Sequence, residues 1–162
     1  MMRDPQLYDY SPLCDRPKIT WPNGARVAFW VAPNIENYEF DPPLNQHRRA
    51  WPKPHPDVVP YSHRDYGNRA GFFRMMEAMA KYNVRGSVSL NVAICQHHPE
   101  LIKVCNELDW ELFSHGIYNT RYTYTMSEAQ ERAMMKDVID TIKDASGQDV
   151  AGWLAPALSH TT

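Results

Sequence analysis

Cysteine is scarce in this sequence: the 162 residues include Cys14, Cys95 and Cys105 and no others. An odd number of cysteines without C-x-x-C spacing indicates neither a disulfide framework nor a zinc knuckle. We therefore expect the three thiols to be reduced and mostly structural.

Long hydrophobic runs and a surplus of one charge are also missing. Residues 1–6 are polar and lack the apolar core of a secretory signal, and no later run is long enough to span a membrane. The net charge is −2, and the 17 basic residues are scattered along the chain. Such a surface attracts no phosphate backbone, so no nucleic-acid partner and no membrane partner are expected, and the expected location is the cytoplasm.

The composition is that of one globular domain, with 43% hydrophobic and 22% charged residues. Most of the 13 prolines lie in residues 1–25, an N-terminal arm, and in an insertion at about 41–65. Proline disfavours both helix and central strand, so these segments are predicted to be irregular. Their aromatic residues favour packing against the domain or a neighbouring subunit, as a lid or an oligomer contact; these are Tyr8, Tyr10, Trp51 and Tyr61.

Residues 26–162 show strands and helices in alternation. Strands are predicted at 26–32, 86–90, 113–114 and 150–154, and helices at 68–82, from Pro99 onwards, and from Ser127 to Gly147, with Ser127 and Gln130 as a capping box. The first helix is expected to bury Phe72, Met76, Met79 and Ala80. This order predicts an α/β fold of parallel strands joined by right-handed crossovers. No helix follows the last strand, so a second polypeptide is expected to complete the sheet, unless the chain is a fragment.

Polar residues follow each predicted strand. Asn34 and Glu36 follow the first strand, Asn91 the second and His115 the third, while Pro156 and Ser159 follow the fourth. The carboxyl ends of parallel strands share one edge of the sheet, where active sites form, so the pattern predicts such a site.

His115 is the strongest candidate because it titrates near neutrality and Gly116 lets backbone approach a ligand. The structural alternative is a core histidine bonded to a carbonyl. Glu36 and Asn34 lie on alternate positions and face one side, although loop solvation explains them equally well.

Other polar residues have weaker signals. Asn119 follows His115 by four residues and is a poor metal ligand. Asn68 and Arg69 start a predicted helix and could receive a carbonyl or an anion there, although simple capping is an equal alternative. His97 and His98 resemble helix caps.

Five segments together resemble the polysaccharide-deacetylase (NodB-homology) superfamily, and within it the branch of metal-independent allantoinases and cyclic imide hydrolases. They are residues 21–28, 66–71, 98–101, 113–120 and 152–159. The resemblance implies a distorted (β/α) barrel that hydrolyses an amide C–N bond. The chain would form only about half of that barrel, the N-terminal half, because family members continue past the position of Thr162.

In metal-dependent members of the superfamily, two aspartates and an H-x-x-x-H motif supply the base and the metal ligands. The aspartates match Asn34 and Glu36 here, and the histidines match His115 and Asn119. The base and one ligand are therefore replaced, which resembles the allantoinase-type branch. The segment Trp153–Pro156 matches a motif that lines the family pocket.

The leading hypothesis is a hydrolase that opens a small cyclic amide, a ureide or an imide, without a cofactor. His115 would transfer the proton, Glu36 would orient or charge His115, and Asn34 would donate to a carbonyl oxygen of the substrate. The predicted substrate-binding residues are Asn68, Arg69, Asn91, Asn119, Trp153, Pro156 and Ser159. The expected partner is a second chain that supplies the remaining barrel, or further copies of this chain.

Two alternatives are retained. The first is metal-dependent N-deacetylation of an amino sugar or polysaccharide, with a divalent ion such as zinc on Glu36, His115 and Asn119. The second is a non-catalytic subunit that completes a partner.

Overall fold

The structure is a computed structural model of the chain, and it describes residues 9–43, 56–124 and 126–161. Its elements, in chain order, are η1 (Leu13–Asp15), η2 (Pro22–Gly24), β1 (Asn34–Ile35), α1 (Val58–Tyr66), the π-helical turn η3 (Gly67–Gly71), α2 (Phe72–Lys81), β2 (Ser87–Leu90), α3 (Ala93–His97), α4 (Pro99–Glu107), β3 (Glu111–Ser114), α5 (Glu128–Ser146) and η4 (Pro156–Leu158).

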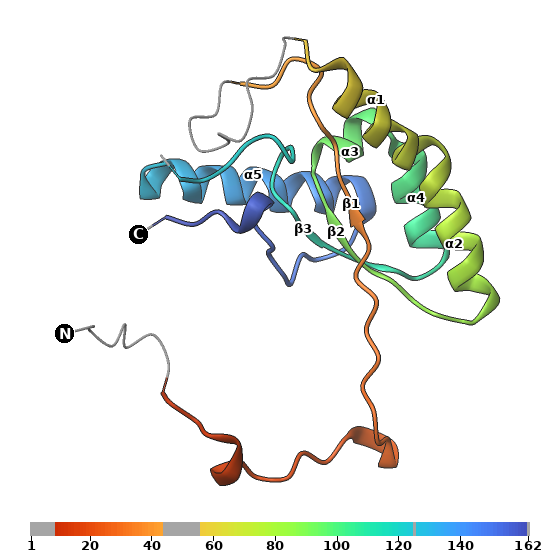
Figure 1. Ribbon diagram of the computed structural model, residues 1–162, viewed down its shortest axis with the longest axis vertical. Helices are drawn as coiled ribbons and strands as arrows, with labels where there is room; N and C mark the ends of the chain where they lie inside the picture. The colour runs from red at the N-terminus through yellow and green to blue at the C-terminus, as the bar shows by residue number, and fades with distance from the viewer. Residues whose placement is uncertain (1–8, 44–55, 125, 162) are drawn as a thin grey trace.

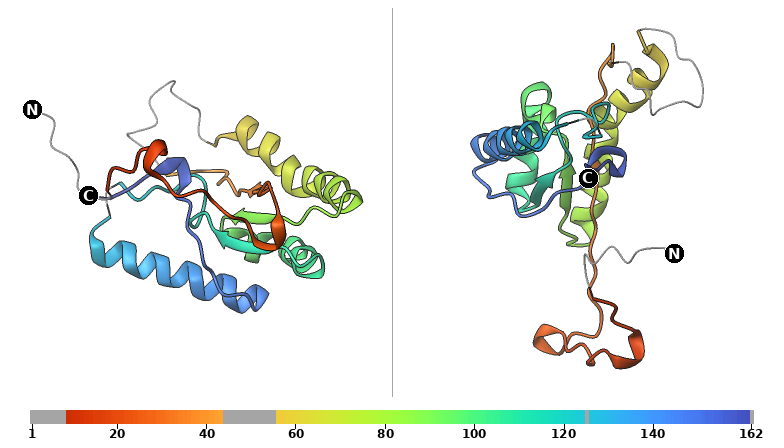
Figure 2. Two further views of the ribbon diagram at one scale, coloured as in Figure 1. Left: turned by 90° about the horizontal axis from the view of Figure 1, so that it is seen from below. Right: turned by 90° about the vertical axis from the view of Figure 1, so that its left-hand side faces the viewer.

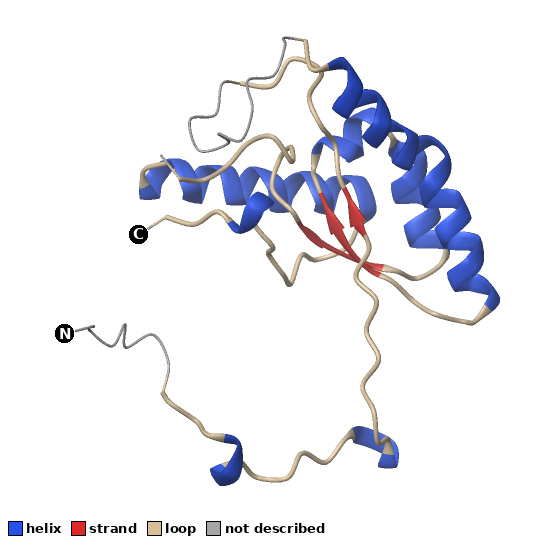
Figure 3. Ribbon diagram, viewed as in Figure 1, coloured by secondary structure: helices blue, strands red, loops and turns tan. Residues whose placement is uncertain are grey.

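The sheet has three parallel strands in the order β1-β2-β3 (Figure 3). Asn34 is paired with Ser89, and Ser89 in turn with Phe113, so the strands share one register. An isolated parallel bridge between Ser114 and Trp153 places the predicted fourth strand beside β3. The predicted α/β class with parallel strands is confirmed.

The hydrophobic core lies between the sheet and its helices. In Figure 1, α1, α2 and α4 lie to the right of the strands, and α5 crosses the left of the view. Val88, Leu90 and Leu112 of the sheet are fully buried, as are Leu101 of α4 and Ile142 of α5. Each buried side chain of this size contributes roughly 1.5–3 kcal/mol. The core therefore holds the strands, and with them the positions of their carboxyl ends.

The first strand lies later in the chain than predicted: β1 is Asn34–Ile35 rather than 26–32, so Asn34 lies in the strand and does not follow it. Residues 26–30 form no ladder, and Val27, Phe29 and Trp30 are at least 70% exposed. Regular pairing is limited to β1, with one earlier bridge between Val31 and Gly86. The apolar alternation predicted a strand, but β-propensity yields a strand only where a neighbouring strand provides a partner.

The proline-rich insertion is partly helical, which corrects the prediction of an irregular segment. Helix α1 begins at Val58, inside the predicted insertion, and continues through η3 into α2. Pro60 lies in the first turn of α1, where the backbone N–H has no partner within the helix, so proline is tolerated there. Residues 44–55 of the insertion lie outside the described residues.

The predicted helices are otherwise confirmed. Helix α4 begins at Pro99, and α5 has the capping box of Ser127 with Gln130 and ends before Gly147. Two details differ. Ala80 is exposed, with Phe72 and Met79 forming the buried face of α2, and the short helix α3 was not predicted.

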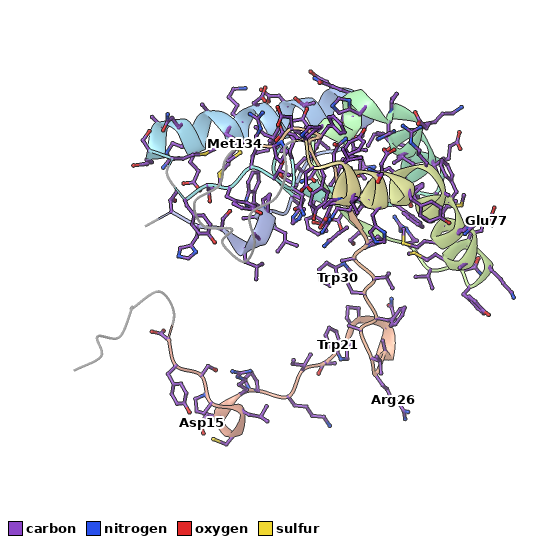
Figure 4. All side chains as sticks on the ribbon, turned by 45° about the horizontal axis from the view of Figure 1, so that its top comes forward. Asp15, Trp21, Arg26, Trp30, Glu77 and Met134 are labelled. Atoms are coloured by element: carbon purple, nitrogen blue, oxygen red, sulfur yellow. The ribbon has the colours of Figure 1, made fainter. Side chains whose placement is uncertain are left out.

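The N-terminal arm extends away from the body of the molecule (Figures 1 and 2). Trp21 lies beside the short turn η2, far from the helices of the body, and Trp30 lies where the arm joins the body (Figure 4). Tyr10 and Leu13 are 90% and 83% exposed. The described arm therefore does not cover its own domain, and a contact with a neighbouring subunit stays a prediction. Tyr8 and Trp51 lie outside the described residues. In the described part of the chain, no helix combines the length and apolar character needed to cross a membrane.

Candidate active site

The side chain of Asn91 joins the ends of all three strands. Its Nδ2 donates to the carbonyl oxygen of His115 at 2.5 Å, and its Oδ1 accepts from the backbone N–H of Asn37 at 2.9 Å. Asn91 is completely buried. Its amide is thus engaged by backbone after β1 and β3 and fixes the loops that carry the candidate residues.

His115 lies directly after β3 and is 4% exposed. Its Nδ1 lies 2.6 Å from the carbonyl oxygen of Leu154, and its Nε2 lies 3.5 Å from Oε1 of Glu36. A carbonyl only accepts, so Nδ1 carries a proton and donates it to Leu154. Nε2 is therefore the atom that gains or loses a proton, and it faces the carboxylate. A separation of 3.5 Å makes this contact an ion pair rather than a short hydrogen bond.

Glu36 is held by two neutral groups in addition to His115. Its Oε2 accepts from the Tyr38 hydroxyl and from Nδ2 of Asn119, both at 2.9 Å. Asn119 Nδ2 also donates to the Tyr38 hydroxyl. Tyr38 was not predicted, although it continues the alternation of Asn34 and Glu36 along the same side of the chain.

The two ionisable groups stabilise each other's charged form. The contact with His115 lowers the pKa of Glu36 below its ordinary value, against the effect of burial, and the Tyr38 hydrogen bond lowers it further. Burial acts to lower the pKa of His115, but Glu36 and the Leu154 carbonyl outweigh it, so that this pKa is raised. Perturbed groups of this kind are typical of functional sites.

The π-helical turn η3 brings Asn68 to this cluster. Asn68 is 8% exposed, and its Nδ2 donates to the backbone carbonyl of Glu36 at 2.9 Å. Turns of this kind are frequent at functional sites. Asn68 positions the loop that carries Glu36, whereas Arg69 is exposed and its Nε lies 2.5 Å from Asp65.

A pocket of about 470 Å³ opens beside Glu36, within the size range of small-molecule sites. Its lining is mostly polar and comes from the loop after β1, from α1 with η3, and from the residues after α3 and β3. The members are Glu36, Asn37, Tyr38, Glu39, Phe40, Asp41, Tyr61, Arg64, Asp65, Asn68, Arg69, His97, His98 and Tyr118. A neighbouring pocket of about 410 Å³ shares Glu36, Tyr38, Arg64 and Asn68 with it and includes the exposed Asn34.

The predicted residues near the C-terminus lie apart from these two pockets. Trp153 pairs with β3, and the buried Pro156 packs against Gly116. Ser159 is 4% exposed, and its Oγ lies 3.2 Å from the Thr123 hydroxyl. None of the three lines either pocket, so their predicted contact with a substrate stays a prediction.

Gly116 is required by the backbone beside His115. Its φ is +70°, and a Cβ there would lie 2.9 Å from Cγ of Pro156. We expect Gly116→Ala to destabilise the fold by about 2–4 kcal/mol, from the left-handed backbone and from overpacking. Gly147→Ala is the matched control, since its φ is +77° and no atom of the described residues lies within 4 Å of the added Cβ. Thermal unfolding should show a larger loss for Gly116→Ala; equal losses would contradict the close contact with Pro156.

The residues that match the superfamily's metal ligands do not fit a zinc site here. Zinc sites usually have three or four ligands drawn from Cys, His, Asp and Glu. Among the described residues, no group of three or more such side chains is placed to hold an ion. Asn119 turns its amide nitrogen toward Glu36, and its amide oxygen has no hydrogen-bond partner among the described residues.

A comparison with family models matches residues 54–162 to the polysaccharide deacetylase family. The chain belongs to this family. The match covers more than half of the sequence and includes α1, η3 and His115, although Glu36 precedes it. The resemblance drawn from the five sequence segments is thereby confirmed at the level of the family. A search of curated proteins found no match.

Solved structures show the same family fold. The Puue allantoinase has a TM-score of 0.67 at 23% identity, over 90% of this chain and 53% of its own. A probable polysaccharide deacetylase from Pseudomonas aeruginosa PAO1 has a TM-score of 0.65 at 28% identity, over 86% of this chain and 50% of its own. A CE4 family pseudoenzyme from Bacillus anthracis has a TM-score of 0.55 at 17% identity, over 80% and 35%. This member of the family thus spans about half, or less, of each of these chains and has the fold of a partial NodB-type barrel.

Proposed function

We propose that the chain contributes the Glu36–His115 pair to a hydrolase that opens a small cyclic amide without a metal ion. The main support is the contact between the Glu36 carboxylate and Nε2 of His115. Glu36 accepts from Tyr38 and Asn119 and faces Nε2 of His115, so the positions that match the superfamily's metal ligands form a connected proton-transfer group.

In the proposed reaction, neutral His115 acts as the general base. Nε2 removes a proton from water while the water oxygen bonds to the ring carbonyl carbon. The tetrahedral intermediate then collapses, the ring C–N bond breaks, and the protonated His115 returns its proton to the departing nitrogen. The product has a carboxyl group and an N–H group in place of the ring amide. Glu36 stabilises the imidazolium while His115 holds the proton.

Of the three asparagines Asn34, Asn91 and Asn119, we propose that Asn34 orients the substrate. Asn91 is engaged by backbone, and Asn119 donates to Glu36 and Tyr38, whereas Asn34 is exposed and lines the neighbouring pocket. The side-chain N–H of Asn34 would donate to the oxyanion formed by the attack of water.

We further propose that the remaining barrel comes from a second chain or from further copies of this chain. Among the described residues β1 pairs with β2 alone, and this unpaired edge supports the proposal, as do the exposed apolar residues of the arm. Native mass spectrometry of the purified protein would report the assembly and any retained metal. A homogeneous, monomeric single chain would contradict it.

The function is tested on that assembly with ring amides such as allantoin, hydantoin and succinimide, and with N-acetylglucosamine oligomers, each with and without a chelator. Ring opening that persists with chelator is expected. The second candidate is metal-dependent deacetylation. The family match and the structure from Pseudomonas aeruginosa favour deacetylation, whereas the described residues supply no group of three metal ligands. Release of acetate that stops with chelator would support that candidate. Neither activity in the complete assembly would indicate a non-catalytic subunit.

A further inference from the structure

One helical face supplies a whole wall of the 470 Å³ pocket. Tyr61, Arg64, Asp65, Asn68 and Arg69 recur at three- and four-residue steps along α1 and η3, and all five line the pocket. Such spacing places side chains on one face of a helix. The ligand that the pocket accepts would therefore lie along this face.

Arg64 has a defined place on that wall. Its guanidinium carbon lies 4.0 Å from the centroid of the Tyr38 ring, and the Tyr38 hydroxyl donates to Glu36. Stacking on an aromatic face holds a guanidinium through its flat side and leaves the N–H groups at its edge available. Arg64 thus lies against Tyr38, and Tyr38 directly contacts Glu36 of the proposed proton-transfer pair.

Other charged groups of the wall already have partners. Glu36 contacts His115, Glu39 pairs with Arg121 at 2.7 Å, and Asp65 pairs with Arg69 at 2.5 Å. No hydrogen bond or ion pair within the described ranges uses the N–H groups of Arg64, although a guanidinium has five donors. Arg64 therefore has N–H donors to offer a ligand, as do the Nη groups of Arg69 within the described residues, but Arg64 is the cation whose charge acts on Glu36.

We propose that Arg64 binds a carboxylate of the ligand in this pocket through a forked pair of hydrogen bonds. Guanidinium and carboxylate match in this geometry, and Lys does not reproduce it. The inference rests on the proposed function, in which opening a ring amide produces a carboxylate. The same group could also belong to the substrate before reaction, as in a hydantoin with a carboxylate side chain.

Equilibrium binding to the assembled protein tests the proposal. The probes are ureidoacetate, which is ring-opened hydantoin, and ureidoacetamide, its uncharged amide. Arg64→Gln is expected to weaken binding of ureidoacetate about ten-fold or more, as for a hydrogen bond to a charged group, and to leave ureidoacetamide unchanged. Arg64→Lys should recover only part of the loss. Arg132→Gln on α5 makes the same charge change in an exposed ion pair and should alter neither affinity.

The two sources of the carboxylate are separated with hydantoin-5-acetate, which is ring-closed and already charged. A loss confined to ureidoacetate assigns Arg64 to the product carboxylate; an equal loss for both assigns it to any carboxylate in the pocket. Equal weakening of the charged and uncharged probes, no weakening by Arg64→Gln, or no binding of either carboxylate overturns the proposal. Selective carboxylate binding without hydrolysis of any ring amide would reject the proposed function and leave Arg64 as an anion site.

Discussion

Replacing His115 by alanine is expected to lower kcat for ring-amide hydrolysis by about 10²- to 10⁴-fold, the range found for general acid–base groups. Nε2 of His115 is the atom that faces Glu36, while Nδ1 is held by the Leu154 carbonyl. The alanine variant removes both contacts. Steady-state kinetics should be measured together with thermal unfolding, so that loss of activity and loss of fold are separated.

His115→Gln sharpens this test because glutamine keeps an N–H donor for the Leu154 carbonyl but cannot transfer a proton near neutrality. It should match the alanine variant in activity and remain closer to the native protein in stability. His160→Ala is the matched control, since His160 is exposed and contacts only the ring of Tyr124 among its described neighbours. Near-native turnover by His115→Gln would show that His115 has a structural role only.

The position of His115 could be predicted because local rules determine it. An apolar strand that runs into His-Gly places the histidine at the carboxyl end of β3. This prediction depends on the local sequence alone and not on which residue His115 contacts. Its contact with Glu36 also follows from parallel pairing, which brings the ends of β1 and β3 to one edge through β2.

The actual use of the amides could not be predicted from the sequence. Asn91, Asn119 and Asn68 all follow strands or begin helical turns, and each was expected to contact substrate. In the structure Asn91 and Asn68 donate to backbone carbonyls and Asn119 donates to Glu36. An amide at a strand end satisfies whichever group lies within reach, and those neighbours come from segments distant in sequence.

Helix α1 shows a second limit of sequence reasoning. Prolines at 52, 54, 56 and 60 led to the prediction of an irregular segment through Asp65, yet the helix begins at Val58. Position within a helix decides whether proline is tolerated, and that position depends on where the helix starts. For this reason Arg64 was not predicted as a site residue, because its place on the pocket wall follows from the helical spacing of α1.

Replacing Glu36 by glutamine is expected to move the acid limb of the pH–rate profile to lower pH and to reduce kcat by about 10- to 100-fold. The base is neutral His115, so the rate rises as pH passes through the pKa of this residue. Glu36 is the main cause that raises this pKa, and without its charge the opposing effect of burial lowers it. A 10- to 100-fold loss corresponds to about 1.4–2.8 kcal/mol. This is less than the roughly 3–5 kcal/mol lost when a buried ion pair loses one partner, because the Glu36 side chain is only partly buried.

Glu39→Gln is the matched control for this change. Glu39 is also an acidic residue of the loop after β1, but it pairs with Arg121 and Thr120 rather than with His115. Its replacement should leave the acid limb in place. If Glu36→Gln abolishes the reaction at every pH, Glu36 itself is the base, and His115 only orients it. An acid limb that stays at the native pH would instead show that the two groups do not share the proton transfer, because only their contact couples the pKa of one to the charge of the other.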